Sequence, residues 1–260
     1  NDFDCNDSGC RAWCWQSKGS ISARCLGKAV VLQPYKFALG KRMSVGKNNW
    51  TPLSTCPAGY KVVGIAQIDI SGGDNNKNHV NDLELTDKGA RGWCYGGSCH
   101  VTARCATLPS GASIKNGAML SNQKSRQWTP IAKCPSGYKA IGLARLDISG
   151  GNNDQNHIND FECNDQGCKA WCWTTGRCSV QPRCVKGVHV VTGTYVTGNA
   201  NGWGPYSKCP SGTKAAGIAR LDMLGGSNNI HVNDFDCNDS GCRAWCWQSK
   251  CQISARCIGK

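Results

Sequence analysis

Three loops of the chain carry acidic and amide side chains at a spacing that could hold a calcium ion. In the fullest copy, Asp147 is followed by Gly150-Gly151-Asn152-Asn153-Asp154. Calcium takes about six to eight oxygen ligands from carboxylates, amides and main-chain carbonyls. Asn and Asp side chains also cap tight turns by themselves, and we favour this second interpretation. We expect no cofactor, and structural Ca²⁺ is the one alternative. The candidate calcium ligands are Asp69, Asp74, Asp147, Asp154 and Asp222.

One histidine occupies the same position after each of these loops: His79, His157 and His231. A single histidine per repeat ligates a metal only where the three converge, so we expect structural hydrogen bonds instead. The sequence contains no plausible nucleophile–base pair, no paired carboxylates at strand ends and no phosphate-binding loop. We therefore expect a protein that is not an enzyme.

Aromatic rings flank a cysteine in a second recurrent motif, as in Trp171-Cys172-Trp173. On a β-strand both rings face one side and the cysteine faces the other. Two interpretations stay open. The rings cover a disulfide-rich core, with one ring of each pair buried, or they stack on a sugar or another subunit beside a cation such as Lys169. The Gly-Gly-Asn loops add an analogy of fold, because prism-type lectins hold sugars there. The candidate ligand-binding residues are Trp13, Trp15, Trp171, Trp173, Trp245, Trp247, Asn152 and Asn153.

Twenty cysteines in 260 residues predict a secreted disulfide scaffold. Leu85 and Ala90 stand where the next repeat has Cys163 and Cys168, and joint loss implies a bond. The opening segment carries Gly19 at the position of the fifth cysteine, and it also lacks the region with the Cys-Pro cysteine. By the same logic, we expect the Cys-Pro cysteine to bond to the fifth cysteine of its repeat. Zinc, suggested by the Cys168–Cys172 spacing, does not explain losses in pairs. The predicted bonds are Cys5–Cys10, Cys14–Cys25, Cys56–Cys99, Cys94–Cys105, Cys134–Cys178, Cys163–Cys168, Cys172–Cys184, Cys209–Cys251, Cys237–Cys242 and Cys246–Cys257.

The charge of the chain favours acidic partners. Thirty basic and 17 acidic residues give a net charge of +13, which suits acidic or sulfated glycans or serves solubility alone. No nucleic-acid motif occurs, and no apolar run is long enough to cross a bilayer. The chain begins at Asn1 without an apolar leader, so we expect that a signal peptide has been removed and that the protein is secreted. Sequons at Asn6, Asn49 and Asn238 fit that route.

The motifs lie in internal repeats. A cassette with an acidic-amide turn, the aromatic–cysteine alternation and a closing Arg-Cys occurs at 1–25, 81–105, 159–184 and 233–257. An upstream unit that begins Trp-Thr-Pro or Trp-Gly-Pro and contains Cys-Pro-x-Gly precedes the last three copies. Residues 1–28 therefore form an unpaired half-repeat, followed by repeats at 29–106, 107–185 and 186–260.

Short β-strands must position all of these residues. Residues 61–70 alternate apolar with small or polar side chains, and residues 81–85 alternate again after a Gly-Gly-Asp-Asn-Asn loop. This pattern is typical of strands joined by turns, and no segment sustains a helical period with caps. We expect an all-β fold of disulfide-rich internal repeats.

The upstream unit resembles the vitelline membrane outer layer protein family. The resemblance rests on Trp50, Cys56-Pro57-x-Gly59-Tyr60, Gly72-Gly73 and Asn81, and on the same positions of the second repeat; Thr213 replaces the tyrosine in the third. It covers only the upstream half of each repeat. The resemblance implies a β-prism, with three sheets around a pseudo-threefold axis, and a place in egg coats and secretions.

Three functions follow as hypotheses. The leading one is a secreted, non-enzymatic structural protein that assembles into an extracellular coat, fibre or matrix. The second is a glycan-binding lectin, and the third is a basic antimicrobial or membrane-acting protein. The chain has four cassettes but only three upstream units, so the first cassette has no upstream unit of its own. We expect residues 1–28 to mediate head-to-tail self-assembly, the alternative being a cap on their own chain.

Overall fold

The computed structural model describes residues 2–6, 9–13, 35–122, 124–225 and 230–259. The chain divides into two units, Asn1–Pro34 and Tyr35–Lys260. In the first unit, β1 (Asp2–Asn6) pairs antiparallel with β2 (Gly9–Trp13). All other strands belong to the second unit, and no helix occurs in the described ranges.

Each repeat of the second unit contributes the same four strands. A long strand, β6 (Lys61–Ser71), β13 (Lys139–Ser149) or β21 (Thr213–Met223), follows the Cys-Pro turn. A hairpin comes next: β7 (His79–Leu85) with β8 (Ala90–Tyr95), β14 (His157–Cys163) with β15 (Gly167–Trp173), or β22 (His231–Cys237) with β23 (Gly241–Trp247). A return strand closes the repeat: β9 (Ser98–Ala106), β16 (Arg177–Lys186) or β24 (Cys251–Gly259). We call these the long strands, docking hairpins and return strands. The strands expected at 61–70 and 81–85 are thus confirmed.

Shorter strands border the sheets, and they lie in the first part of each repeat, before its long strand. They are β3 (Phe37–Leu39), β4 (Met43–Val45), β5 (Asn49–Trp50), β10 (Ser113–Asn116), β11 (Leu120–Ser121), β12 (Ala132–Lys133), β17 (His189–Thr192), β18 (Val196–Gly198), β19 (Gly202–Trp203) and β20 (Ser207–Lys208). Each pairs with a return strand or with the second strand of a docking hairpin.

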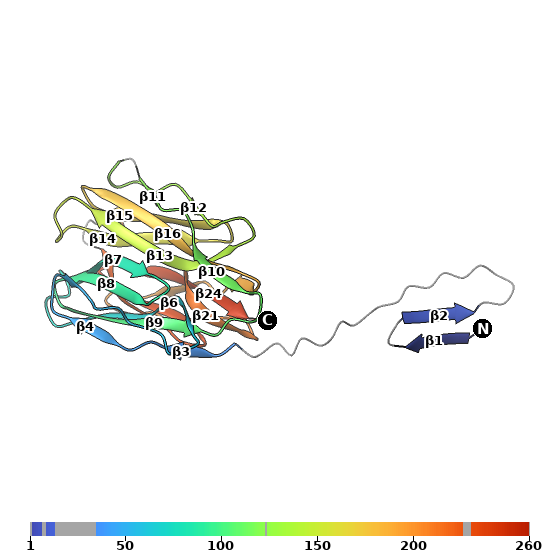
Figure 1. Cartoon of the computed structure of the whole chain (residues 1–260). Helices are drawn as coiled ribbons and strands as arrows, with labels where there is room; N and C mark the ends of the chain where they lie inside the picture. Colours follow the sequence, from blue (N-terminus) through green and yellow to red (C-terminus); the bar gives the residue numbers. More distant parts are fainter. Residues whose placement is uncertain (1, 7–8, 14–34, 123, 226–229, 260) are drawn as a thin grey trace. The chain divides into compact units, whose positions relative to one another are not determined.

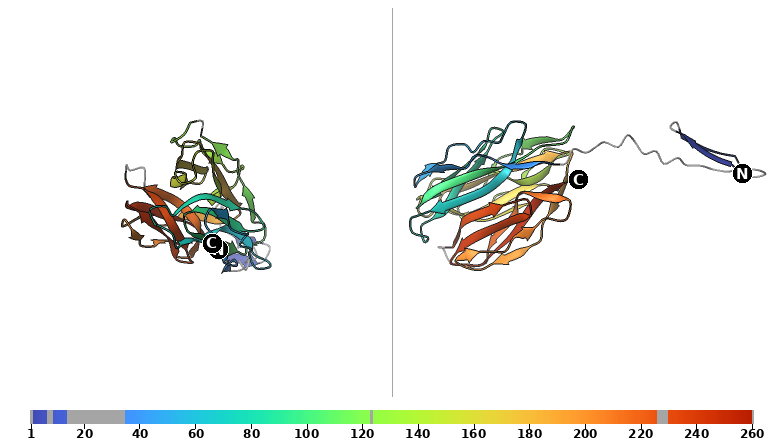
Figure 2. Two further views of the ribbon diagram at one scale, coloured as in Figure 1. Left: turned by 90° about the vertical axis from the view of Figure 1, so that its left-hand side faces the viewer. Right: turned by 90° about the horizontal axis from the view of Figure 1, so that it is seen from below.

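Three antiparallel sheets result, and each combines two repeats. The sheets run β19-β23-β22-β6-β9-β3, β10-β16-β13-β7-β8-β5 and β12-β15-β14-β21-β24-β17. Every docking hairpin leaves its own repeat and pairs with the long strand of the next one, and the last hairpin, β22–β23, pairs with the first long strand, β6. The fold is therefore all-β and prism-like, closed in a ring by its last hairpin (Figures 1 and 2).

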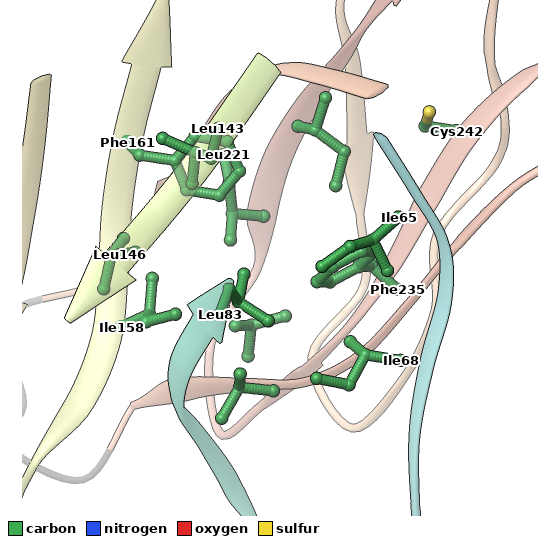
Figure 3. Packing of buried hydrophobic residues seen from close by; sticks show 14 of the residues in the cluster. Ile65, Ile68, Leu83, Leu143, Leu146, Ile158, Phe161, Leu221, Phe235 and Cys242 are labelled. Carbon is green, nitrogen blue, oxygen red and sulfur yellow. The ribbon is translucent and has the colours of Figure 1, made fainter. Parts of the chain in front are cut away.

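A single core joins the three sheets. Leu83, Phe161 and Phe235, one from each docking hairpin, are almost fully buried in a cluster to which all three long strands contribute (Figure 3). At Gly64 a side chain would meet the carbonyl oxygen of Ala216 at 2.0 Å, so the absence of a Cβ lets two long strands approach closely. Burying each such hairpin side chain stabilises the fold by about 1.5–3 kcal/mol.

The disulfides confirm part of the predicted pairing. Cys163–Cys168 and Cys237–Cys242 form as expected. Backbone register places Cys5 opposite Cys10, but their side chains, like Cys14 and Cys25, lie outside the described residues.

The other six predicted bonds are wrong. The Cys-Pro cysteine pairs with the last cysteine of its repeat, and the fourth pairs with the fifth. The observed bonds are Cys56–Cys105, Cys134–Cys184, Cys209–Cys257, Cys94–Cys99, Cys172–Cys178 and Cys246–Cys251, in place of Cys56–Cys99, Cys134–Cys178, Cys209–Cys251, Cys94–Cys105, Cys172–Cys184 and Cys246–Cys257. The physical reason is chain reversal: the fourth and fifth cysteines flank the tight turn between hairpin and return strand, which brings them together.

Candidate functional site

The docking of each hairpin on the next long strand recurs in all three repeats. Its register is the same three times: Leu83 lies opposite Leu146, Phe161 opposite Leu221, and Phe235 opposite Ile68. The neighbouring cross-strand pairs are polar: Glu84 with Arg145, Glu162 with Arg220, and Asp236 with Gln67. An apolar pair inside the core and a polar pair outside it therefore fix each hairpin.

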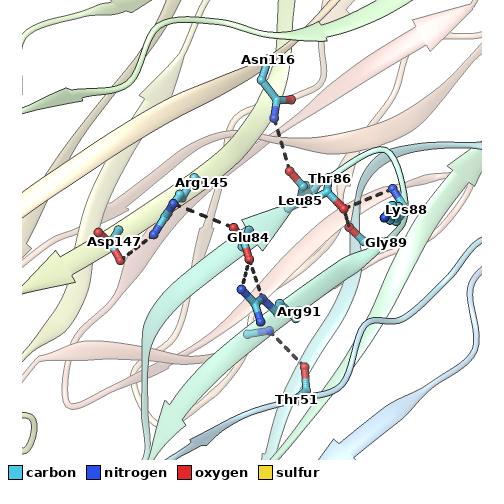
Figure 4. Close-up of polar contacts among 11 residues, drawn as sticks. Thr51, Glu84, Leu85, Thr86, Lys88, Gly89, Arg91, Asn116, Arg145 and Asp147 are labelled. Atoms are coloured by element: carbon cyan, nitrogen blue, oxygen red, sulfur yellow. Dashed lines mark hydrogen bonds and ion pairs between the residues drawn. The ribbon is translucent and has the colours of Figure 1, made fainter.

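Glu84 shows how the outer pair is connected. Its carboxylate lies 2.5 Å from the Arg91 guanidinium of its own hairpin and 3.9 Å from Arg145 of the neighbouring long strand. Arg145 in turn contacts Asp147 at 3.4 Å. Figure 4 shows the chain of contacts across the junction of the two strands. These groups are partly exposed, so they contribute orientation more than stability.

A half-buried aspartate directly precedes the apolar residue of each docking contact and also contacts the next long strand. Asp82, Asp160 and Asp234 each accept a hydrogen bond of 2.7 Å from a main-chain N–H of the next long strand. Burial raises the pKa of all three to about 7, although the same N–H bonds oppose the shift. The carboxylates of Asp147, Asp222 and Asp69, respectively, raise it further.

A buried arginine binds the turn of each docking hairpin. Arg104, Arg183 and Arg256 of the closing Arg-Cys motif are at most 3% exposed. Each donates to a main-chain carbonyl of another repeat, at Ala215, Val62 and Ala140. Each also forms an ion pair with the aspartate of a docking-hairpin turn: Arg104 with Asp239 at 2.5 Å, Arg183 with Asp87 at 2.8 Å, and Arg256 with Asp165.

Sequence reasoning missed this Arg–Asp anchor. The signal was the recurrence of the closing arginine and of the turn aspartate in every cassette. Burial alone would raise the pKa of Asp239, but hydrogen bonds from Lys214 and Arg104 hold it below its ordinary value. The anchor therefore keeps its negative charge at neutral pH.

The three histidines do converge. Their ring centroids lie 5.3–5.4 Å apart. His79 Nε2 lies 3.2 Å from the Asn153 carbonyl oxygen, and His231 Nε2 lies 3.4 Å from that of Asn75, so these two make structural hydrogen bonds. Burial lowers the pKa of His79 to about 3 and that of His157 well below its ordinary value. His79 and His157 are thus neutral at neutral pH, and the three rings form a buried junction of the three repeats.

The candidate calcium ligands fall into different places. Asp69, Asp147 and Asp222 pair with Arg42, Arg145 and Arg220 beside the docking contacts. Asp74 caps its own turn through a 3.0 Å hydrogen bond from the Asn76 N–H, and Asp154 borders a cavity of about 280 Å³ over the histidines. Among the residues described, no group of three or more His, Cys, Asp or Glu side chains has the geometry of a metal site. Calcium binding by these loops stays the less favoured alternative to turn capping.

The aromatic rings form a row on the outer face of each docking hairpin. A cation lies over the first ring in each: Arg91 over Trp50 at 4.7 Å, Lys169 over Trp128 at 4.8 Å and Arg243 over Trp203 at 4.5 Å. The expectation that one ring of each pair is buried is wrong for the three described pairs: Trp93, Tyr95, Trp171, Trp173, Trp245 and Trp247 are all half-buried. They alternate with buried cysteines, so both rings lie on the outward side.

In the second repeat, the aromatic rings of this row line a cavity of about 330 Å³. Trp128, Trp171 and Trp173 line it together with Asn159 and Asp160. Trp171 and Trp173 were predicted as ligand-binding residues, while Trp128 and Asp160 were not. Asn153 instead offers its carbonyl to His79 and Asn81, and Trp245 and Trp247 form the row of the third repeat. The side chains of Trp13 and Trp15 lie outside the described residues.

Two of the sequon asparagines can be placed. Asn49 is exposed at the start of β5, and Asn238 accepts hydrogen bonds from the N–H groups of Ser240 and Gly241 in the last hairpin turn. The side chain of Asn6 is outside the described residues.

Comparison with known proteins adds no relative. No protein-family model matches the chain, and a search of curated proteins gave no match. In the described residues, no helix is long and apolar enough to span a membrane.

Proposed function

We propose that the protein is a secreted, non-enzymatic structural protein that self-associates through its N-terminal cassette. One observation carries the proposal. Each long strand of Tyr35–Lys260 already holds a docking hairpin from the same unit, and β1–β2 is a fourth hairpin of the same sequence type. Among the described strands, β1 and β2 form a two-stranded sheet of their own, and unpaired strand edges invite pairing with another chain.

The disulfides support an extracellular setting for this structure. Eight bonds are described within Tyr35–Lys260, and such a density persists in oxidising compartments. The prism-like arrangement of three sheets is the fold that the resemblance to vitelline membrane outer layer proteins implies. A place in an extracellular coat is consistent with both.

The test is the mass of the protein in solution as a function of concentration. Light scattering should show concentration-dependent oligomers for the full chain and a monomer for a chain that starts at Ala29. Circular dichroism of both serves as the control, since the truncation leaves the three repeats intact. Equal masses for the two chains at every concentration would contradict the proposal.

A second candidate function is saccharide binding at the aromatic cavity of the second repeat. Tryptophan rings stack on the apolar faces of sugars, and the exposed Trp128 lines the cavity together with Asp160. The net charge of +13 favours acidic or sulfated glycans.

A glycan array with sulfated and neutral sugars separates this function from self-association. We expect saturable binding that Trp128→Ala weakens at least tenfold. Trp50→Ala, at the matching position of the first repeat, should leave it unchanged. Binding that is equal in both variants would exclude this cavity as the site.

A further inference from the structure

We propose that self-association works by hairpin exchange: β1–β2 of one copy docks on β6 of a second copy, in the place that β22–β23 of that second copy holds in the closed ring. This inference rests on the proposed function and names its mechanism. The partner is a second copy of this chain.

The order of the strands along the chain supports the exchange. The docking hairpin β7–β8 precedes β13 in the sequence and pairs with it, and β14–β15 precedes and pairs with β21. The hairpin that precedes β6 in the sequence is β1–β2. The position on β6 is instead taken by β22–β23, which comes last in the chain and closes the ring. Two hairpins of one chain, β1–β2 and β22–β23, can therefore compete for pairing with the same strand, β6.

The two hairpins have the same residues at the docking contacts made from Asn233 onward, while His231 and Val232 of β22 precede the matching stretch. Residues 1–18 are identical to residues 233–250. The buried Phe235 corresponds to Phe3, and Asp234, which accepts the Ile70 N–H, corresponds to Asp2. Asp239, the partner of Arg104, corresponds to Asp7. An incoming β1–β2 thus brings the side chains needed for the apolar pair, the N–H bond and the ion pair.

The outer polar pair of β6 is reproduced by the N-terminal hairpin. On β6 the residue opposite Asp236 is Gln67. On β13 and β21 the corresponding residues are arginines, which face the longer Glu84 and Glu162. Asp4 of β1 corresponds to Asp236, so the N-terminal hairpin carries the residue that matches β6.

The contacts made from Asn233 onward are the same for both hairpins, so exchange reproduces them, and the ring keeps the additional contacts of His231. The closed ring is favoured by the effective concentration of its own hairpin, on the order of millimolar for short flexible connections. Linked copies accumulate as the protein concentration approaches that range, because exchange replaces an internal contact by one between copies. Since donor and acceptor are different surfaces, the contact is heterologous and can propagate.

Cysteine cross-linking at the Asp236–Gln67 position tests the inference directly. One full-length copy carries Asp4→Cys and a second, of different tag mass, carries Gln67→Cys. Opposed residues of antiparallel strands have Cα atoms about 4.5–5.5 Å apart, which a disulfide can bridge. We expect a mixed disulfide between the two copies that increases with concentration, at least tenfold above a control in which Arg145→Cys on β13 replaces Gln67→Cys. Peptide mass mapping identifies the bond.

A locked chain provides the second arm. Asp236→Cys with Gln67→Cys in one copy should bond β22 to β6 and reduce oligomer formation at least tenfold, and adding reductant should restore it. If the full chain forms oligomers while cross-linking to Gln67→Cys only equals the Arg145→Cys control, or while the locked chain assembles normally, exchange is wrong and self-association stands. If the full chain stays monomeric at all concentrations, both are wrong.

Discussion

The buried arginine of each closing Arg-Cys motif connects its own repeat to another repeat of the ring. Arg183 donates to the Val62 carbonyl of another repeat and to the carboxylate of Asp87. Replacing it by methionine keeps most of the volume but leaves that carbonyl without its donor. We expect Arg183→Met to lower the free energy of unfolding by about 1–3 kcal/mol, measured by urea denaturation.

Asp87→Asn is the matched control for that experiment. The Asp87 side chain is 78% exposed, so losing its charge should change stability by less than about 1 kcal/mol. A control variant that is destabilised as much as Arg183→Met would show that the surface ion pair, and not the buried carbonyl bond, holds the hairpin.

The cysteines show how far residue-by-residue reasoning from the sequence reaches. The joint absence at Leu85 and Ala90 correctly identified the Cys163–Cys168 bond, because one bond lost both ends. The absence at Gly19 and of the Cys-Pro region was different: these positions belong to two separate bonds, as Cys172–Cys178 and Cys134–Cys184 show. Absence in pairs identifies a bond only where both losses come from the same one.

At the scale of the element, each docking contact is sensitive to pH through its aspartate. The folded-state pKa of Asp160 is about 7, above its value of about 3.9 in an unfolded chain. Protonation therefore favours the folded state. The stability from this group is fully present below pH of about 4 and is lost as pH rises through about 7.

We expect Asp160→Asn to remove this dependence, because the amide oxygen can still accept the Met223 N–H. The slope of unfolding free energy against pH between about 4 and 7 should change by up to about 1.4 kcal/mol per pH unit. Thermal or urea denaturation at several pH values measures it. An unchanged slope would mean that Asp160 is ionised in the fold throughout that range.

The strands themselves could be predicted, but their partners could not. Alternation at residues 61–70 and 81–85 fixed two strands in each repeat, because burial of one face imposes a period of two. Nothing in that period tells whether a hairpin folds onto its own repeat or onto the next. The information lies in pairs distant in sequence, such as Arg104 with Asp239, and in the backbone approach at Gly64.

Across the whole molecule, the buried histidines and aspartates titrate in opposite senses. His79 has a folded pKa of about 3 and His157 one well below 6.5, so their neutral forms stabilise the fold and that stability is lost as pH falls below about 6.5. The three raised aspartates lose stability as pH rises through the same region. Between about pH 4 and 6.5 the effects oppose each other, which predicts that the stability falls with rising pH less steeply than the three aspartates alone would make it fall.

Removing a buried histidine should leave the pH dependence from the aspartates less opposed. We expect the unfolding free energy of His157→Phe to fall more steeply than that of the native protein as pH rises from 4.5 to 6.5. The measurement is urea denaturation at intermediate pH values. Parallel curves for the two proteins would show that His157 is protonated in the fold, contrary to its burial.

The most direct test of the account compares two equivalent phenylalanines. Sedimentation velocity over a range of concentrations, with thermal melting alongside, should separate Phe3→Ala from Phe235→Ala. The account predicts that Phe3→Ala reduces oligomer formation at least tenfold without changing the melting temperature. It predicts that Phe235→Ala destabilises the closed ring by about 3–5 kcal/mol. Oligomers of Phe3→Ala that form as readily as those of the native chain would contradict the account.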